Sequence, residues 1–406
     1  MKQRYLAQAL KTISFENDKM AFVSGPRQVG KTTLAKRLLK EYAIGAYYNW
    51  DDIEFRRLWT KDPKKIISPS RTSRPCIILD EIHKAKGWKR SIKGVFDTLS
   101  APADILVTGS ARLNIYKRGG DSLLGRYFHF HLHPFSLREL GNAKPLSPDE
   151  CWHHLFNEPF DASKERSSFL SALMQFGGFP DPIFKQDQKL ASLWRKGRIE
   201  MIIREDVRDL SRIPELSQIE MLAALLPERV GSLLSLNSLR EDLEVSHDTV
   251  KRWLQLLGEL YYHFRIPPYS KSISRSLKKD NKLYLWDYSE VASAGSRLEN
   301  LVASHLLKAC HYWTDTGEGV FELFFLRNKE KQEIDFLITR DRKPWLPIEV
   351  KSRLNQPTAS WSKFLPLLPC KHGIQVVTDD GVWKRYAVGN GEVIVMSLAQ
   401  MLQAFV

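Results

Sequence analysis

Residues 23–39 read VSGPRQVGKTTLAKRLL, and this stretch decides the fold of the N-terminal part of the chain. Its centre fits the pattern G-x-x-x-x-G-K-[ST] at Gly25, Gly30, Lys31 and Thr32. The two glycines let backbone amides turn inward around phosphate groups, and the helix that follows presents its positive N-terminus to them. The stretch therefore predicts a strand, a phosphate-binding loop and a helix, in that order.

The chemistry expected at this loop is that of a nucleoside triphosphate. Lys31 is expected to reach the β- and γ-phosphates, and Thr32 to give its hydroxyl to Mg²⁺. The residues expected to bind the nucleotide are Gly25, Pro26, Arg27, Gln28, Val29, Gly30, Lys31, Thr32 and Thr33.

Two acids follow a second apolar run, in IILDE, where Asp80 and Glu81 end a predicted buried strand. We expect Asp80 to hold magnesium through water and Glu81 to polarise the attacking water. The alternative is a strand that ends in two solvated acids. A third run, ILVTGS, ends with Thr108 and Ser110, and a hydroxyl there is expected between the acid pair and the γ-phosphate. An ordinary strand-end serine is the alternative for Ser110.

Arg126, in LLGRYFHF, directly precedes a fourth predicted strand. In ring-forming ATPases an arginine near this point reaches the γ-phosphate of the neighbouring subunit, which makes Arg126 the candidate arginine finger. Arg112 and Arg118 are rivals for that role, and a plain salt-bridged arginine is the alternative.

Apolar runs alternate with amphipathic stretches over the first third of the chain, which predicts an α/β fold with a parallel sheet in three layers. The chain then becomes mostly helical, shows three short amphipathic segments, and ends in mixed strands and helices. We expect four domains, covering residues 1–145, 146–213, 214–275 and 276–406.

Composition favours a globular cytoplasmic protein with a polyanionic partner. The net charge of +14 favours nucleic acid, although a generally basic surface would have the same charge. The four cysteines are scattered without a CxxC pair, which argues against zinc and disulfides. Neither a secretory signal nor a 20-residue apolar run is present, so no membrane partner is expected.

The segment SLNSLREDLEVSHDTVKRWLQLLGELYY, residues 235–262, predicts a helix, a turn and a helix, with Ser246 capping the second. The exposed face of that second helix carries the candidate nucleic-acid contacts His247, Thr249, Lys251 and Arg252. The alternative is a winged-helix module used only for packing or protein contact, and four acids in the segment weaken the DNA interpretation.

Carboxylates and a lysine recur in the tail. Asp335 lies on one predicted strand and Glu349 and Lys351 on the next, where alternation puts both on one face. Glu299 lies on a helix upstream. Acids that converge with a lysine are what metal-dependent phosphodiester cleavage needs, so these residues are a candidate second Mg²⁺ or Mn²⁺ site. Charged strand ends are the alternative.

Taken in order, these motifs resemble a family of bacterial and archaeal AAA-type ATPases that carry a C-terminal domain of unknown function with a restriction-endonuclease-like core. The resemblance covers nearly the whole chain and rests on GPRQVGKTTLAKRL, IILDEIHKAKGWKRSIK, VTGSARL, GRYFHFHLHPFSLREL, FGGFP, SHDTVKRWLQLL and FLITRDRKPWLPIEVKS.

The resemblance implies a P-loop module of the ASCE/AAA type, a helical and winged-helix middle, and a PD-(D/E)XK-like α/β domain. It implies ATP and Mg²⁺ as cofactors. It also implies that the protein forms homo-oligomers, with a ring as one form. No sensor arginine motif follows GFPDP, which leaves Arg195, Arg198 and Arg204 as candidates only.

Three functions follow from these observations. The first is a DNA-associated motor that remodels or translocates DNA or processes branches and forks. The second is a nuclease gated by ATP. The third is a signalling or scaffold ATPase whose nucleotide state switches protein contacts without nucleic acid.

Overall fold

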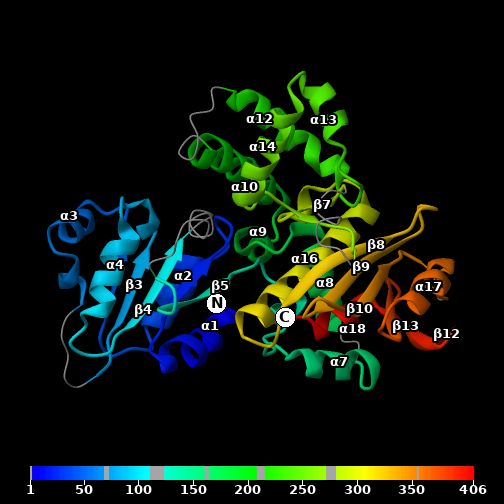
Figure 1. The fold of residues 1–406 in the computed structure, drawn as a ribbon, viewed down its shortest axis with the longest axis horizontal. Coiled ribbons are helices and arrows are strands. Elements are labelled where there is room, and N and C mark those ends of the chain that lie inside the picture. Colours follow the sequence, from blue (N-terminus) through cyan, green and yellow to red (C-terminus); the bar gives the residue numbers. More distant parts are fainter. Residues whose placement is uncertain are drawn as a thin grey trace. The chain divides into compact units, whose positions relative to one another are not determined.

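The computed structural model describes residues 2–67, 73–109, 123–160, 164–207, 215–270, 280–353 and 356–406. The chain divides into two compact units (Figure 1). Unit 1 is Gln3–His133, and unit 2 is Pro134–Val406 together with Lys2. The four-domain boundaries expected from the sequence stay a prediction.

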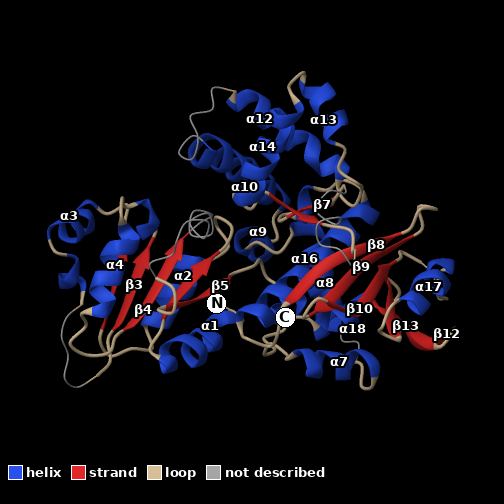
Figure 2. Cartoon of the chain, viewed as in Figure 1, coloured by secondary structure: helices blue, strands red, loops and turns tan. Residues whose placement is uncertain are grey.

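Unit 1 is built around a sheet of five parallel strands in the order β2-β3-β4-β1-β5 (Figure 2). The strands are β1 (Met20–Ser24), β2 (Gly45–Asn49), β3 (Cys76–Asp80), β4 (Asp104–Gly109) and β5 (Tyr127–His131). The helices are α1 (Leu6–Ala9), α2 (Lys31–Leu39), α3 (Ile53–Lys61) and α4 (Trp88–Asp97). A π-helical turn over Leu10–Ser14 continues α1. Short 3₁₀ turns cover Phe15–Asn17, Pro63–Ile66 and Ile82–Lys84.

The burial of the strands follows their place in the sheet. All residues of β1, β3 and β4 are buried, as expected for central parallel strands covered on both faces. The edge strands β2 and β5 are mostly half-buried. Strand β4 lies between β1 and β3. The phosphate loop follows β1 and the acid pair lies at the end of β3, so one strand separates them.

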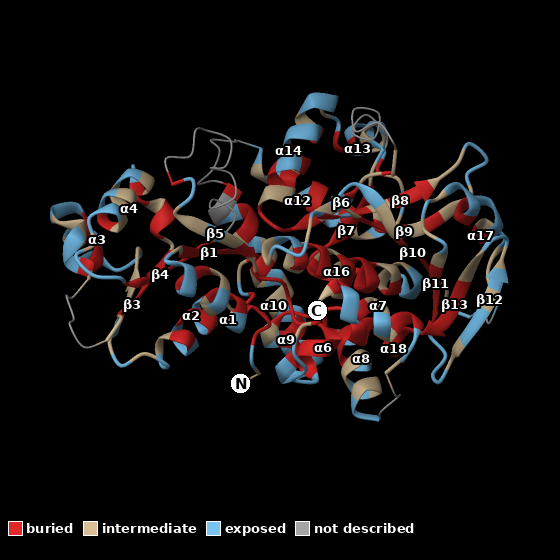
Figure 3. Ribbon diagram, turned by 60° about the horizontal axis from the view of Figure 1, so that its bottom comes forward, coloured by how far each residue is buried: buried red, intermediate tan, exposed pale blue. Residues whose placement is uncertain are grey.

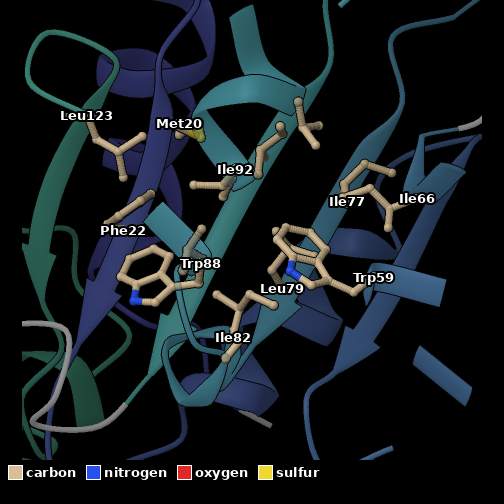
Figure 4. Packing of buried hydrophobic residues seen from close by; sticks show 14 of the residues in the cluster. Met20, Phe22, Trp59, Ile66, Ile77, Leu79, Ile82, Trp88, Ile92 and Leu123 are labelled. Atoms are coloured by element: carbon tan, nitrogen blue, oxygen red, sulfur yellow. The ribbon is translucent and has the colours of Figure 1, made fainter. Parts of the chain in front are cut away.

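One face of this sheet carries an apolar cluster of buried residues (Figure 4). Phe22 and Leu79 from the strands pack with Trp88 and Ile92 of α4 and Trp59 of α3. Because strand side chains alternate, the intervening residues point to the other face, where α2 packs on β3 and β4. The result is a three-layer α/β unit, as the sequence predicts.

Unit 2 begins with helices. They are α6 (Leu137–Leu140), α7 (Pro148–Phe156), α8 (Lys164–Phe176), α9 (Pro180–Lys185) and α10 (Gln188–Glu200), which a wider turn continues over Met201–Val207. Helix α7 starts at a capping box, in which the Ser147 hydroxyl and the Glu150 backbone and side chain bond reciprocally, with Pro148 in the first turn.

Three helices and a small sheet follow: α12 (Leu216–Leu225), with a 3₁₀ turn over Leu226–Arg229, α13 (Leu236–Leu243), α14 (His247–Glu259), β6 (His263–Ile266) and β7 (Lys282–Leu285). Strands β6 and β7 pair antiparallel. Ser246 caps α14 by accepting a hydrogen bond from the Thr249 amide at 3.1 Å, as predicted. The buried face of α14 includes Val250, Trp253 and Leu257.

The C-terminal part of unit 2 is a six-stranded mixed sheet in the order β12-β13-β11-β10-β9-β8. Its elements are α16 (Ala294–Asp315), β8 (Phe321–Arg327), β9 (Glu333–Arg340), β10 (Lys343–Val350), α17 (Ala359–Phe364), β11 (His372–Val377), β12 (Trp383–Val388), β13 (Gly391–Ser397) and α18 (Leu398–Ala404), with 3₁₀ turns at Tyr288–Glu290 and Leu365–Leu367. Strands β10, β11 and β13 run parallel, and the remaining pairs are antiparallel.

Helix α16 is the central helix of unit 2 and is buried along most of its length (Figure 3). It packs on β8, β9 and β10. Its Lys308 is buried and pairs with the buried carboxylate of Glu139 on α6, and the lysine also donates to the Ser136 hydroxyl at 3.0 Å. A buried charge is tolerated only when it is paired and hydrogen-bonded, and Lys308 meets both conditions.

Two glycines of unit 1, when replaced by alanine, test the packing of its strands and helices with opposite expected effects on stability. A Cβ at Gly45 would lie 2.4 Å from Leu39 Cδ1 and 2.8 Å from the Cys76 carbonyl oxygen, whereas a Cβ at Gly94 in α4 would meet nothing within 4 Å. We expect Gly45→Ala to lower the free energy of unfolding by about 1–3 kcal/mol through overpacking. Gly94→Ala should raise it by about 0.5–1 kcal/mol through helix propensity. Urea denaturation of both variants measures this, and a shift of the same sign in both would contradict the packing described.

Candidate nucleotide-binding site

The phosphate loop connects the end of β1 to the start of α2. Gln28 and Gly30 both have positive φ, 62° and 99°, which turns the loop back on itself before the helix begins at Lys31. Gly25 is required for a different reason, because a Cβ there would lie 2.3 Å from the carbonyl oxygen of Leu132. The loop therefore depends on glycine at position 25, because a larger residue there would disrupt its shape.

Lys31 is buried inside this loop. Its ammonium donates to the carbonyl oxygens of Gly25 at 2.9 Å and Pro26 at 2.7 Å. Val29 is also buried, whereas Arg27 is half-buried and Gln28, Thr32 and Thr33 are exposed. The ammonium thus lies where the loop curls around it, held by neutral oxygens that are weaker partners for a cation than phosphate oxygens.

Asp80 is the buried acid of the site, and three hydroxyls surround its carboxylate. Thr32 Oγ1 lies 2.7 Å from Asp80 Oδ2, Tyr47 donates to the same oxygen at 2.7 Å, and Thr108 donates to Oδ1 at 2.6 Å. The contact with Thr32 joins the phosphate loop to the end of β3. Hydroxyl and carboxylate oxygens are the ligands that Mg²⁺ takes in proteins, so Thr32 and Asp80 fit that ion.

Tyr47 is a site residue that motif reasoning misses. It comes from the edge strand β2, whose residues GAYYN match no phosphate-site pattern. Burial raises the pKa of Tyr47, and its hydrogen bond to Asp80 raises it further, so the phenol stays a proton donor to the carboxylate. Its place in the site follows from the pairing of β2 with β3, which brings the phenol to the acid strand.

Glu81 follows Asp80 in a left-handed backbone conformation, with φ of 58°. A non-glycine residue there is uncommon and is a mark of functional sites. The Glu81 amide donates to the Thr108 carbonyl at 2.9 Å, which fixes the turn. Burial raises the pKa of the Glu81 carboxyl, and the positive charges of Lys31 and Lys84 partly offset that rise.

Arg4 braces the loop and Tyr5 braces the end of β5, and sequence reasoning missed both. Arg4 is buried, and its guanidinium donates to the Val29 carbonyl at 2.6 Å and to the His133 carbonyl. Tyr5 donates to the His131 carbonyl. A buried arginine beside an apolar helix face is the pattern that could have indicated them.

Arg126 is engaged within unit 1. Its Nε and one terminal nitrogen bind the two oxygens of Asp97, at 2.6 and 2.9 Å. The pair is partly exposed, so an approaching group could replace Asp97. Its role as an arginine finger stays a prediction, and Ser110, Arg112 and Arg118 lie outside the described residues.

The three arginines considered for a second sensor are each held in unit 2. Arg198 is buried, stacks 4.4 Å from the centre of the Phe179 ring and donates to the Tyr261 carbonyl. Arg195 donates to Ser289, and Arg204 binds Glu220.

The four candidate nucleic-acid contacts lie at the start of α14. His247, Lys251 and Arg252 are exposed, and the Thr249 hydroxyl bonds to that of Ser246 at 2.8 Å. His247 lies 3.9 Å from Asp248, which also is exposed. The structure thus brings these side chains together within the first two turns of the helix, next to an acid.

The tail carboxylates come together with a lysine that sequence reasoning missed. Lys282 on β7 lies 3.3 Å from Glu299, 3.3 Å from Glu333 and 3.7 Å from Asp335. Burial alone would lower the pKa of Lys282, but these carboxylates raise it above its ordinary value. The lysine therefore stays charged.

The hairpin of β9 and β10 brings the remaining residues to the same cluster. The Val350 amide donates to Asp335 Oδ2 at 2.8 Å, and Lys351 lies 3.0 Å from Glu349, on the same strand face as predicted. Across the residues that the structure describes, no group of three or more His, Cys, Asp or Glu side chains is arranged to hold a metal ion.

Comparison with known proteins matches three family models along the chain. Residues 17–141 match the AAA domain family, residues 168–314 match a domain of unknown function (DUF8612), and residues 294–400 match another (DUF4143). Unit 1 therefore has the P-loop α/β fold of AAA-type ATPases. The match covers the phosphate loop, the acid pair and all five strands of the sheet.

The relatives found by sequence are themselves described as uncharacterized. One is from Haemophilus influenzae, 23% identical over 363 residues, covering 83% of each chain. Another is from Methanocaldococcus jannaschii, 23% identical over 349 residues, covering 82% of this chain and 74% of that protein. They extend the similarity through both units.

Solved structures give weaker likenesses. The Orc1 protein of Aeropyrum pernix in complex with DNA is 15% identical, covering 74% of this chain and 89% of that one, with a TM-score of 0.29. DnaA of Aquifex aeolicus bound to AMPPCP is 16% identical, covering 63% and 85%, with a TM-score of 0.30. Scores this low do not define a shared overall arrangement.

Tyr47→Phe tests the hydroxyl cluster around Asp80. We expect the variant to bind ATP with Mg²⁺ about 3- to 10-fold more weakly, because Asp80 loses one hydrogen bond that orients it. Binding of ATP in EDTA should change little. Isothermal titration calorimetry measures both, with Tyr48→Phe as the matched control, because the Tyr48 hydroxyl bonds to the Ile66 carbonyl instead. Equal losses in Tyr47→Phe and Tyr48→Phe would argue against a role at Asp80.

Proposed function

We propose that this protein binds and hydrolyses ATP with Mg²⁺ at the site formed by the phosphate loop and the ends of β3 and β4. The observation that carries the proposal is the 2.7 Å contact between Thr32 and Asp80. It places the hydroxyl and the acid expected of a magnesium site next to a loop whose lysine points inward. The match of residues 17–141 to the AAA domain family supports the same chemistry.

Each residue then has a defined task. Amides of the loop over residues 25–33 and the Lys31 ammonium bind the β- and γ-phosphates, and the Lys31 side chain leaves the Gly25 and Pro26 carbonyls to do so. Glu81 accepts a hydrogen bond from the attacking water and orients it. Thr32 and Asp80 hold Mg²⁺, which when bound neutralises charge on the phosphates. Thr108 and Tyr47 keep the Asp80 carboxylate in position.

The proposed partner is DNA, which the protein remodels, translocates or processes at branches and forks. The net charge of +14 supports a polyanionic partner. Helices α12, α13 and α14 followed by the β6–β7 pair suit a winged-helix module, and His247, Thr249, Lys251 and Arg252 are its proposed contacts. The protein is proposed to act as a homo-oligomer in which Arg126 exchanges Asp97 for the neighbouring subunit's γ-phosphate.

For the C-terminal part we propose a restriction-endonuclease-like fold. Helix α16, strands β8, β9 and β10, helix α17 and strand β11 support it, because they follow one another in the order helix, three antiparallel strands, helix and parallel strand. The described residues contain no helix long and apolar enough to span a bilayer. The cytoplasm is the proposed compartment.

Two variants separate nucleotide binding from turnover. Lys31→Ala should abolish the calorimetric heat of ATP binding, because the loop loses the cation that meets the phosphates. Glu81→Gln should keep binding but lower the hydrolysis rate on the order of 10²–10⁴-fold, the usual contribution of a positioned base. Phosphate release and calorimetry measure the two effects. Normal turnover by Glu81→Gln would show that another group orients the water.

The DNA proposal is tested by hydrolysis rates with single-stranded, duplex, forked and four-way DNA. We expect at least one form to stimulate turnover, and its affinity to fall log-linearly with salt as counterions are released. Lys251→Ala/Arg252→Ala should weaken binding, with Lys196→Ala, another exposed lysine of unit 2, as a control variant. Rates that no DNA form changes, with no gel shift at low salt, would favour the scaffold ATPase instead. A protein partner captured only with ATP after nuclease treatment would support that alternative.

A further inference from the structure

Lys282 lies at the centre of the carboxylates that the tail motifs offer for a metal ion. Its side chain is 3% exposed, and its ammonium is within 3.7 Å of Glu299, Glu333 and Asp335. These acids come from α16 and β9, whereas the lysine comes from β7. Three separate elements of unit 2 therefore converge on one buried positive charge.

The oxygens of the cluster already have hydrogen-bond or ion-pair partners. Glu299 Oε1 accepts a hydrogen bond from Tyr284 at 2.7 Å, in addition to its contact with the lysine. Asp335 Oδ2 accepts from the Val350 amide, and Glu333 also binds Arg327. These partners are donors, as carboxylates neutralised within a protein require.

The second Glu299 oxygen lies close to the backbone at Gly231. A Cβ at Gly231 would lie 3.1 Å from Glu299 Oε2, and Gly231 has a φ of 78°. A side chain at position 231 would therefore crowd the Glu299 carboxylate.

A divalent ion does not fit this arrangement. Mg²⁺ needs near-octahedral oxygen ligands at about 2.0–2.1 Å, usually with several waters. An ammonium that contacts the same carboxylate oxygens would repel the ion and exclude its waters. The donor set around Lys282 thus differs from that of a metal-dependent nuclease, although the carboxylates are present.

We propose that Lys282 is the resident cation of this centre and takes the place of a divalent metal. Its single positive charge is shared by the Glu299, Glu333 and Asp335 carboxylates, of which Glu333 also pairs with Arg327, and it holds β7 against α16 and β9. The C-terminal part is in consequence a metal-independent module, and no metal-activated water forms at these acids. The inference concerns unit 2 alone and does not rest on ATP hydrolysis.

Removing the lysine should make the centre dependent on a metal. In Lys282→Met the stem volume is kept, but three carboxylates lose their shared cation. We expect the melting temperature in EDTA to fall by at least about 4 °C, the scale for a broken buried ion pair in a domain of this size. Millimolar Mn²⁺ should restore at least half of that loss, because the ion supplies the missing charge. Wild-type protein should show no shift with Mn²⁺.

The measurement is differential scanning calorimetry of the full chain without nucleotide, together with Mn²⁺ binding by electron paramagnetic resonance. Lys308→Met is the matched control, because Lys308 is equally buried but pairs with the single carboxylate of Glu139. It should lose stability and gain none from Mn²⁺. Lys282→Met/Asp335→Asn should also lose the rescue, because a ligand is missing.

Mn²⁺ binding to the wild-type protein tests the proposal even where a variant does not fold. One Mn²⁺ bound per wild-type chain, and lost in Asp335→Asn, would overturn it. So would a Lys282→Met protein that folds but melts like wild type, or one that Mn²⁺ does not stabilise. Absence of wild-type binding with rescue confined to Lys282→Met supports it.

Discussion

The carboxylate of Asp80 is the interaction on which the N-terminal unit depends, because it joins three strands and the phosphate loop at one point. Thr108 is its direct neighbour in the register of β3 and β4, and Tyr47 comes from β2 on the other side. Thr32 comes from the first turn of α2, directly after the phosphate loop. A buried carboxylate needs such donors, and the parallel sheet supplies them because the carboxyl ends of its strands lie at one edge.

The sequence predicts the central part of this unit well, for a physical reason. Strands β1, β3 and β4 are buried on both faces, so they are continuous apolar runs that end at the motif residues. Strand β2 is an edge strand with half-buried residues, and its GAYYN has neither a continuous apolar run nor clean alternation. The hydrogen bond from Tyr47 to Asp80 could therefore not be predicted from the sequence, because β2 is recognisable as a strand only through its pairing with β3.

The tail shows the same limit at a larger distance in sequence. Glu299, Asp335 and Glu349 are recognisable because acids on neighbouring elements form a known pattern. Lys282 belongs to no such pattern, since a lysine in a short strand is ordinarily expected to be solvated. Its burial results from β7 pairing with β6 and packing beside α16, contacts that the residues of β7 alone do not reveal. Whether acids form a metal site is thus decided by a residue that the motif does not contain.

The buried lysines of this protein differ in what holds them, and that difference separates exchangeable from permanent charges. The Lys31 ammonium donates to the neutral carbonyls of Gly25 and Pro26, so phosphate oxygens can compete for it. Lys282 faces three half-buried carboxylates, and removing its charge would take away the cation that all three share. The first arrangement suits a side chain that changes partners when a ligand arrives. The second suits one that fixes the fold, which is why similar side chains serve binding in one unit and architecture in the other.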